Sequence, residues 1–294
     1  MSHPDAVAHA DESGSKGLVH NLKPPKDADF GLCCSIIVPT GQASAVQAVL
    51  SIPFEQFKRE AAARVKKLHI TDALRQSSLR TMACEVRDAI FEVIRKYDLR
   101  IVYCARRLGT LRAEHSMLRE IEQIGTALGG SQKGVGSNPI DGDRVESDLM
   151  RGLVLRLDAF AEERGWTQVD PVSDRVDKAV QNDLDEAIKE TQTLTNRKIV
   201  VDSVHGGQVE IQFSVHGESG LDVTHVGPLK VLDVVDEMSF AADVVANSLR
   251  SHLGEMPDGH ALNAPSSVRG WPLESQVDGV QENAWEDQQP SSGA

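Results

Sequence analysis

The most constraining feature of the sequence is a continuous apolar run at residues 32–38 (LCCSIIV), which Pro39 ends. A strand with apolar side chains on both faces must be covered on both faces, as strands are in α/β sheets. Helix-like segments alternate with strand-like runs along the chain, and one of them carries apolar residues at three- and four-residue spacing from Met82 to Ile94. The sequence therefore predicts an α/β fold in which helices flank a sheet.

The expected elements follow from hydrophobic spacing and from turn residues. We expect strands at residues 6–10, 32–38, 99–105, 166–169, 198–204 and 209–215. We expect helices at residues 43–67 with a break at Pro53, and at 79–96, 111–128, 145–164, 174–190 and 238–253. The first strand should stop at Asp11, where small polar residues favour a turn. Gly165 is expected to end the helix that precedes it.

Length and composition favour one large folded unit followed by a tail. Of the 294 residues 40% are hydrophobic and only 4% aromatic, so a core would rest on Val, Leu, Ile and Ala. After residue 253 the chain is rich in Pro, Gly, Asn and Gln, with little apolar material. We therefore predict a domain at residues 1–253, with helical insertions, and a disordered acidic tail at residues 254–294.

Membrane insertion and secretion are not expected. No stretch approaches the roughly 18 apolar residues of a membrane span. The first five residues (MSHPD) have neither the basic start nor the apolar run of a secretory signal. The four cysteines lack CxxC spacing and lie in apolar segments, so we interpret them as small buried hydrophobes. These features predict a cytoplasmic protein without zinc or disulfides.

The net charge of −13 argues against non-specific coating of nucleic acid, which requires an excess of Lys and Arg. About −6 of this charge lies after residue 254. Basic residues cluster at Lys58, Arg59, Arg64, Lys66 and Lys67, and again at Arg95, Lys96, Arg100, Arg106, Arg107 and Arg112. These clusters indicate either a local basic surface or ordinary solvated helix faces.

Several acidic residues stand at expected strand ends or on an apolar helix. Asp11 and Asp170 follow strand-like runs, and strand ends line a common edge in an α/β sheet. Asp243 lies within an apolar helical stretch, where a buried carboxylate would need a partner. Each also has a structural explanation: Asp11 and Asp170 as turn residues, Asp174 as a helix cap, and Asp243 as a surface residue. Only their joint occurrence favours a site.

A polar interruption at residues 68–72 (LHITD) contains His69 and Asp72. It is equally typical of a connector in which Thr71 or Asp72 caps the next helix. The later histidines lack the spacing of metal-binding motifs such as HExxH. The sequence therefore does not predict a histidine-built metal site.

In this order the motifs resemble the family known as domain of unknown function 3800, whose members have a ribonuclease-H-like fold. The resemblance rests on the DESG motif at residues 11–14 with the apolar strand at 32–38, on residues 68–72, on residues 166–174 and on residues 240–246 (FAADVVA). The last segment departs from the family's usual QLADLVA. The third lacks the common Asp-Glu pair, which leaves Asp170 and Asp174 as rivals, and we favour Asp170.

The resemblance implies a mixed sheet flanked by helices and an acidic metal site. Hard Mg²⁺ or Mn²⁺ prefers oxygen ligands, and two such ions can assist phosphodiester cleavage. The implied metal ligands are Asp11, with Asp170 or Asp174, and Asp243. Glu12, His69 and Asp72 would support the ligands or transfer protons, because His titrates near neutral pH.

The sequence thus favours a metal-dependent nuclease or related phosphoryl-transfer enzyme, with DNA or RNA as its partner. The alternative is a non-catalytic ribonuclease-H-like module that binds nucleic acid or protein. The fold alone does not decide between them, because one fold hosts many activities.

Overall fold

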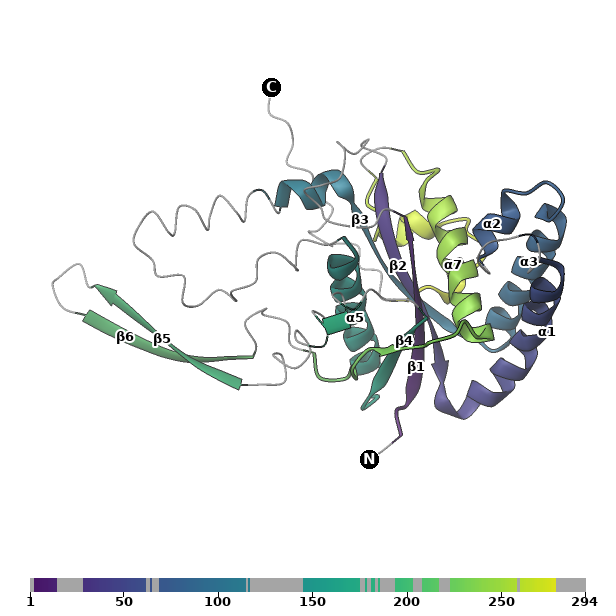
Figure 1. Ribbon diagram of the computed structural model, residues 1–294. Coiled ribbons are helices and arrows are strands. Elements are labelled where there is room, and N and C mark those ends of the chain that lie inside the picture. The colour runs from purple at the N-terminus through teal and green to yellow at the C-terminus, as the bar shows by residue number, and fades with distance from the viewer. Residues whose placement is uncertain are drawn as a thin grey trace, which may run out of the picture.

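The computed structural model describes residues 3–14, 29–61, 64, 69–114, 116, 145–174, 178, 181–182, 185, 194–202, 208–216, 223–257 and 260–278. At its centre is a five-stranded mixed sheet in the order β3-β2-β1-β4-β7 (Figure 1). The strands are β1 (Ala6–Gly14), β2 (Phe30–Pro39), β3 (Arg100–Arg107), β4 (Val169–Ser173) and β7 (Lys230–Val231). β2 is antiparallel to β1 and β3, whereas β4 is parallel to β1 and β7. The predicted α/β class is confirmed.

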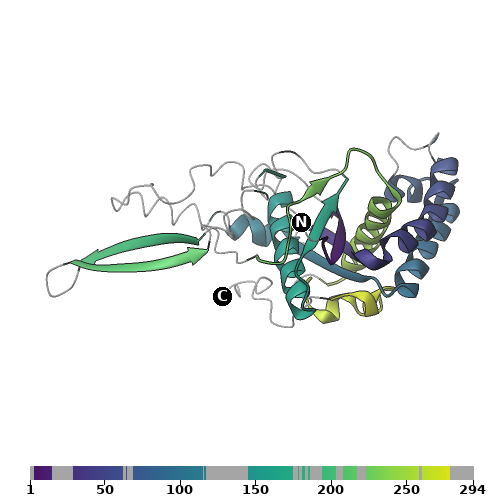
Figure 2. The same ribbon diagram turned by 90° about the horizontal axis from the view of Figure 1, so that it is seen from below.

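Helices cover both faces of this sheet, as Figures 1 and 2 show. On one face lie α1 (Ala43–Ala61), α2 (Ile70–Leu74), α3 (Arg80–Lys96) and α7 (Glu237–Leu253). On the other face lies α5 (Val145–Glu163). Two hydrophobic cores result, one between the sheet and α1, α3 and α7, the other between the sheet and α5. β2 contributes to both cores, which explains its apolar run.

Alternation along β1 places its residues on two different faces. Ala6, Ala8 and Ala10 are buried in the core beside α5. Because successive side chains of a strand point to opposite faces, Asp11 and Ser13 lie on the α7 face. The sequence of β1 therefore directs Asp11 and Ser13 toward the last helix.

Three element boundaries differ from the sequence-based expectations. β1 does not turn at Asp11 but stays paired with β2 as far as Gly14. α1 runs through Pro53 without a break and ends at Ala61. β4 begins at Val169, where we expected the strand to end, and it contains Pro171 paired with Ala8. The strand therefore ends at Ser173 instead of Val169, so that Asp174 and not Asp170 follows it.

The expected strands near residues 198–215 form a separate hairpin. β5 (Leu194–Asp202) and β6 (Gln208–His216) pair with each other as a two-stranded antiparallel sheet. This sheet lies apart from the main one in both ribbon views. Of the helix expected at 111–128, residues 108–114 are helical and most of the rest lies outside the described residues. The same holds for most of the helix expected at 174–190.

The chain after α7 is ordered over residues 260–278, so the disorder that we expected does not apply to this stretch. Asn263 exchanges two hydrogen bonds with the backbone of Ala105, and Val277 forms a bridge with Ile101. This C-terminal strap (residues 260–278) thus follows β3 and pairs with its outer edge, which would otherwise expose unpaired backbone groups. Residues 279–294 lie outside the described part of the chain.

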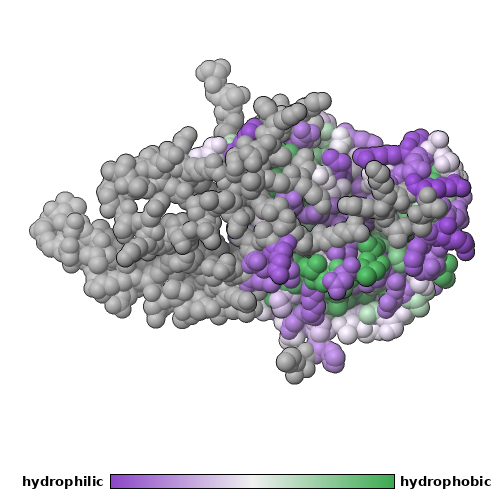
Figure 3. Space-filling view, in the orientation of Figure 1, coloured by the Kyte–Doolittle hydropathy of each residue, from purple (hydrophilic) through white to green (hydrophobic). Residues whose placement is uncertain are grey.

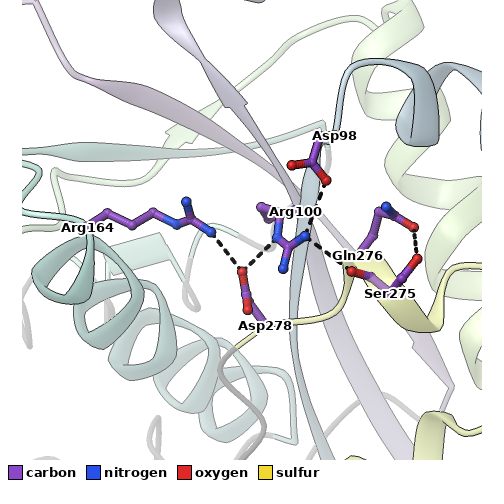
Figure 4. A network of polar contacts seen from close by, with 6 residues as sticks. All are labelled: Asp98, Arg100, Arg164, Ser275, Gln276 and Asp278. Atoms are coloured by element: carbon purple, nitrogen blue, oxygen red, sulfur yellow. Dashed lines mark hydrogen bonds and ion pairs between the residues drawn. The ribbon is translucent and has the colours of Figure 1, made fainter.

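An ion-pair network anchors the end of the strap (Figure 4). The carboxylate of Asp278 accepts hydrogen bonds from Arg100 Nε at 2.7 Å and from Arg164 at 3.0 Å. Burial alone raises the pKa of Asp278, but the hydrogen bonds and charges of the two arginines outweigh it and lower the pKa. The network joins β3, the end of α5 and the strap.

The surface is mixed in character. On the face shown in Figure 3, hydrophilic residues dominate over the helical layer at the right, and hydrophobic surface gathers below the centre. The large hydrophobic residues that are most exposed are Ile52 and Val234. Among the described residues, no helix is both long enough and apolar enough to cross a membrane.

Candidate functional site

α7 runs alongside β1, and matched spacing brings their polar residues together. From Asp11 to Ser13 the strand advances about 6.6 Å, and from Asp243 to Asn247 the helix advances about 6 Å. One turn of α7 therefore covers nearly the same length as two residues of β1. Ser13 Oγ donates to Asn247 Oδ1 at 3.3 Å, and the charge of Asp243 acts on Asp11. These four residues form a polar seam between strand and helix.

Asp243 is buried, with 6% of its surface exposed, and three protein groups bind its carboxylate. The backbone N–H of Ile70 donates to Oδ2 at 2.9 Å. Asn247 Nδ2 donates to Oδ1 at 2.6 Å, and His69 Nδ1 lies 3.3 Å from the same oxygen. A buried carboxylate requires such partners, so the surface-residue interpretation of Asp243 is excluded.

Asp243 also organises the short helix α2. The His69 side chain makes no capping hydrogen bond, so the carboxylate from α7 satisfies the first backbone N–H of α2 in its place. Thr71 Oγ1 donates to Asn247 Oδ1. This segment, for which the sequence left a connector and a site motif as alternatives, is thus fixed to α7 by Asp243 and Asn247.

The carboxyl group of Asp11 has a pKa well above its ordinary value. Burial is the largest cause, and the negative charges of Asp243, Asp174 and Glu12 follow in that order. Desolvation and like charges both disfavour the ionised form of a carboxyl group. Three carboxylates from β1, α7 and the end of β4 therefore crowd into one region, although part of Asp11 remains accessible to solvent.

The structure places Asp174, and not Asp170, beside Asp11. β1 pairs with β4 so that Ala10 is opposite Ser173, which brings Asp174 level with Asp11. Asp170 is opposite Val7, four residues earlier on β1, which is about 13 Å along the strand. Its buried side chain accepts hydrogen bonds from Gln168 and from Lys230. Our preference for Asp170 over Asp174 is therefore corrected.

The remaining expected site residues, Glu12, Asp72 and His69, lie around Asp11 and Asp243 on different elements. Glu12 alternates with Asp11 and so lies on the α5 face of β1, where its charge raises the pKa of Cys33 after the larger effect of burial. Asp72 is partly exposed in the first turn of α2, and its backbone N–H donates to His69 at 3.2 Å. Of these residues, His69 alone contacts Asp243 in the hydrogen bonds described above.

The sequence reasoning missed Asn247, Ser13 and Thr71. Asn247 stands four residues after Asp243, on the same face of α7, and Ser13 stands two residues after Asp11, on the same face of β1. These spacings were visible in the sequence. The pairing across the two elements was not visible, because it depends on how α7 lies along β1.

The donor chemistry fits a hard divalent cation, because Asp11 and Asp174 supply carboxylate oxygens whose mutual repulsion a cation would relieve. The described side chains do not, however, form a complete set of metal ligands. Within the described residues, no three His, Cys, Asp or Glu side chains are gathered in a group that could hold a metal ion.

Several arginines of the expected basic clusters are already paired. Arg95 bonds to Glu92, Arg100 to Asp98 and Asp278, and Arg106 to Glu114. These three are therefore not a continuous free basic surface. Comparison of the chain with models of known protein families, with curated proteins and with solved structures finds no match.

Proposed function

We propose that the chain is a divalent-metal-dependent phosphodiesterase acting on nucleic acid, with a ribonuclease-H-like fold. The observation that carries this proposal is that Asp11 is desolvated by burial and lies near the charges of Asp243 and Asp174, which together raise its pKa well above the ordinary value. Strongly shifted pKa values cluster at functional sites, because crowded charges destabilise a fold that gains nothing from them. The mixed sheet, with carboxylates on the first strand, a central strand and the last described long helix, agrees with the arrangement that the resemblance implies.

In this proposal the residues have separate roles. Asp11 and Asp174 would hold Mg²⁺ or Mn²⁺, and Asp243 would fix the positions of His69 and α2. A bound ion would supply Lewis acidity and stabilise developing negative charge on the phosphate. The resemblance assigned Asp243 to direct metal binding, but three protein donors already bind its carboxylate, which favours an orienting role.

His69 is the proposed proton carrier. An ionised carboxylate only accepts hydrogen bonds, so Asp243 sets the tautomer of the neutral ring with the proton on Nδ1. Nε2 then carries the lone pair that accepts a proton. Glu12 lies on the opposite face of β1 and Asp72 lies in the first turn of α2, and we assign both residues to the surroundings of the site.

The alternative function, a module that binds nucleic acid or protein without catalysis, is favoured by one observation. The described residues hold no preformed metal-binding group, and the carboxylate of Asp243 is occupied by protein donors. A module of this kind would bind its partner equally well without divalent ions. Metal dependence therefore separates the two functions.

The decisive experiment incubates purified protein with DNA and with RNA oligonucleotides in the presence of Mn²⁺, and again with a chelator. We expect cleavage that Asp11→Asn and Asp174→Asn each reduce at least about a hundredfold, as expected for loss of a group that stabilises charge in the transition state. Asp170→Asn is the matched control and should retain activity in its folded fraction. Cleavage that persists in both Asp11→Asn and Asp174→Asn would disprove the proposal.

A further inference from the structure

Arg250 lies at the end of the polar seam between β1 and α7. It is exposed and stands two turns after Asp243 on α7. Its guanidinium carbon lies 5.7 Å from the centre of the Phe30 ring, an arrangement that holds a cation over an aromatic face. Phe30 itself is buried at the start of β2. The arginine side chain therefore rests against the sheet at the end of β1.

Gly14 leaves the space that this arginine occupies. A Cβ atom at Gly14 would lie 3.1 Å from Arg250 Nε and 2.7 Å from the carbonyl oxygen of Phe30. Gly14 also has a positive φ of 117°, which side-chain-bearing residues rarely adopt. The final glycine of the DESG motif thus gives the guanidinium group access to the end of β1.

Arg250 forms no ion pair within the described part of the protein. Arg95, Arg100 and Arg106 pair with carboxylates, whereas Arg250 has no such partner there. Its position near the C-terminal end of α7 also favours a cation through the helix dipole. That effect explains a positive charge in the last turn, but it does not explain why the arginine faces Gly14 beside the acidic site.

We infer that Arg250 binds a phosphate group next to the one that would lie at the proposed metal site of Asp11 and Asp174, so that the substrate is a polynucleotide with at least two phosphates. The inference rests on the proposed function. Arg250 lies seven residues after Asp243 on α7, and Gly14 lies three residues after Asp11 on β1. The rise per residue of a helix or of a strand makes either separation about 10 Å. One phosphate group cannot span this separation, whereas consecutive phosphates of one chain can.

The first test measures binding of single-stranded DNA and RNA oligonucleotides with a chelator present, which prevents cleavage. Arg250→Ala should weaken binding about tenfold, the usual loss for one charge-assisted hydrogen bond. The slope of log K against log salt should also fall by about 0.7, the value for one phosphate contact on a single strand. Arg250→Lys keeps the charge and should restore most of the slope.

Lys96→Ala is the matched control, because it removes one exposed positive charge at the opposite end of the sheet. Lys96 lies just before β3, which begins at Arg100. In the sheet register Arg100 is opposite Ile37 of β2, and Ile37 is opposite Ala8 near the start of β1, whereas Arg250 lies near the end of β1. This variant should bind like the unmodified protein. Identical binding by Arg250→Ala and Lys96→Ala would overturn the inference, as would failure of the unmodified protein to bind either oligonucleotide.

A second test uses substrates that differ in phosphate number. With Mn²⁺, Arg250→Ala should raise KM for an oligonucleotide about tenfold. It should leave the hydrolysis of bis(p-nitrophenyl) phosphate, which has one phosphate, unchanged. Equal losses on both substrates would overturn the inference. If Arg250→Ala weakens binding but no variant cleaves either substrate, the inference about Arg250 holds and the proposed metal-dependent cleavage fails.

Discussion

Asn247 Nδ2 donates to the carboxylate of Asp243, one turn earlier on α7, at 2.6 Å. The amide oxygen of the same residue accepts from Ser13 on β1 and from Thr71 on α2. One asparagine therefore joins three elements and fixes the carboxylate that holds α2. No aspartate or leucine at this position would both donate to Asp243 and accept from two hydroxyl groups.

We predict that Asn247→Ala destabilises the protein by about 1–3 kcal/mol, because it removes one donor from buried Asp243 and the acceptor of the partly buried Ser13 and Thr71 hydroxyl groups. Asn247→Asp should be at least as harmful, since it places a second negative charge one turn from Asp243. Urea denaturation of both variants measures the change. Ser251→Ala, at an exposed position of α7, is the control and should leave the free energy of unfolding unchanged.

We predict that Asp11→Asn stabilises the protein at neutral pH by about 1 kcal/mol, as other substitutions that relieve strained functional sites do. The unfolded chain titrates Asp11 near 3.8, whereas the folded protein raises this pKa, first through burial and then through Asp243, Asp174 and Glu12. Between the two values the folded state binds more protons, so stability falls as the pH rises through that window.

The gain from Asp11→Asn should therefore be largest above the raised pKa and should vanish as the pH falls toward 4. Unfolding in urea across this pH range measures it. Asp88→Asn, which changes an exposed aspartate on α3, is the control and should leave the free energy of unfolding at neutral pH unchanged. An Asp11→Asn protein that is less stable than the unmodified protein at neutral pH would contradict the crowding of carboxylates at this site.

Divalent ions should stabilise the folded protein if Asp11 and Asp174 hold them. A ligand at a hundred times its Kd adds about 2.7 kcal/mol to the free energy of unfolding. We predict that Mn²⁺ raises Tm of the unmodified protein and of Asp170→Asn, but not of Asp174→Asn. Asp170→Asn is the informative comparison, because it removes a buried carboxylate paired with Lys230 and lies away from Asp11. A metal effect lost in Asp170→Asn and kept in Asp174→Asn would reverse our assignment.

The choice between these two aspartates shows where the sequence was insufficient. Pro171 lacks the N–H that a strand interior uses, so proline normally indicates a strand end. The sequence-based expectation agreed with this rule, because it placed the strand at residues 166–169, before Asp170. In the structure Pro171 lies inside β4, opposite Ala8, and the strand continues to Ser173. The parallel pairing with β1, which no local pattern encodes, decides which aspartate reaches Asp11.

Other features were predictable because local pattern and tertiary structure agree. The apolar run of β2 required cover on both faces, and it has that cover. Asp243 in an apolar helix required a partner, and it has three. The strap was not predictable in this way, because its hydrogen bonds to β3 come from Asn263 and from the backbone rather than from an apolar period.

The strap provides a further prediction. Asp278→Asn should lower the free energy of unfolding by about 1 kcal/mol, a modest value because the ion pairs are partly exposed. The arginines lower the pKa of Asp278 below 3.8 against the effect of burial, so this stabilisation is present above 3.8 and is lost as the pH falls below it. Hydrogen exchange at residues 260–278 should increase in Asp278→Asn, and not in the exposed control Ser266→Ala.

Gly14→Ala tests the local conformation at the end of β1. The substitution should destabilise the protein by about 2 kcal/mol or more, because a positive φ strains any residue with a Cβ. The new Cβ would also lie 2.7 Å from the carbonyl oxygen of Phe30, which is backbone of a paired strand and cannot move away. Conformational strain and steric clash therefore act together at this position, and urea denaturation measures their sum.

Gly165→Ala separates these two causes. Gly165 has a φ of 65°, and a Cβ there would meet no atom within 4 Å. This variant should therefore lose only the conformational part, about 1 kcal/mol. Equal losses in Gly14→Ala and Gly165→Ala would show that β1 and β2 separate readily at Gly14. In that case the packing of Arg250 against Gly14 would impose no constraint on the residue there, and the fourth position of the DESG motif would require glycine for its φ alone.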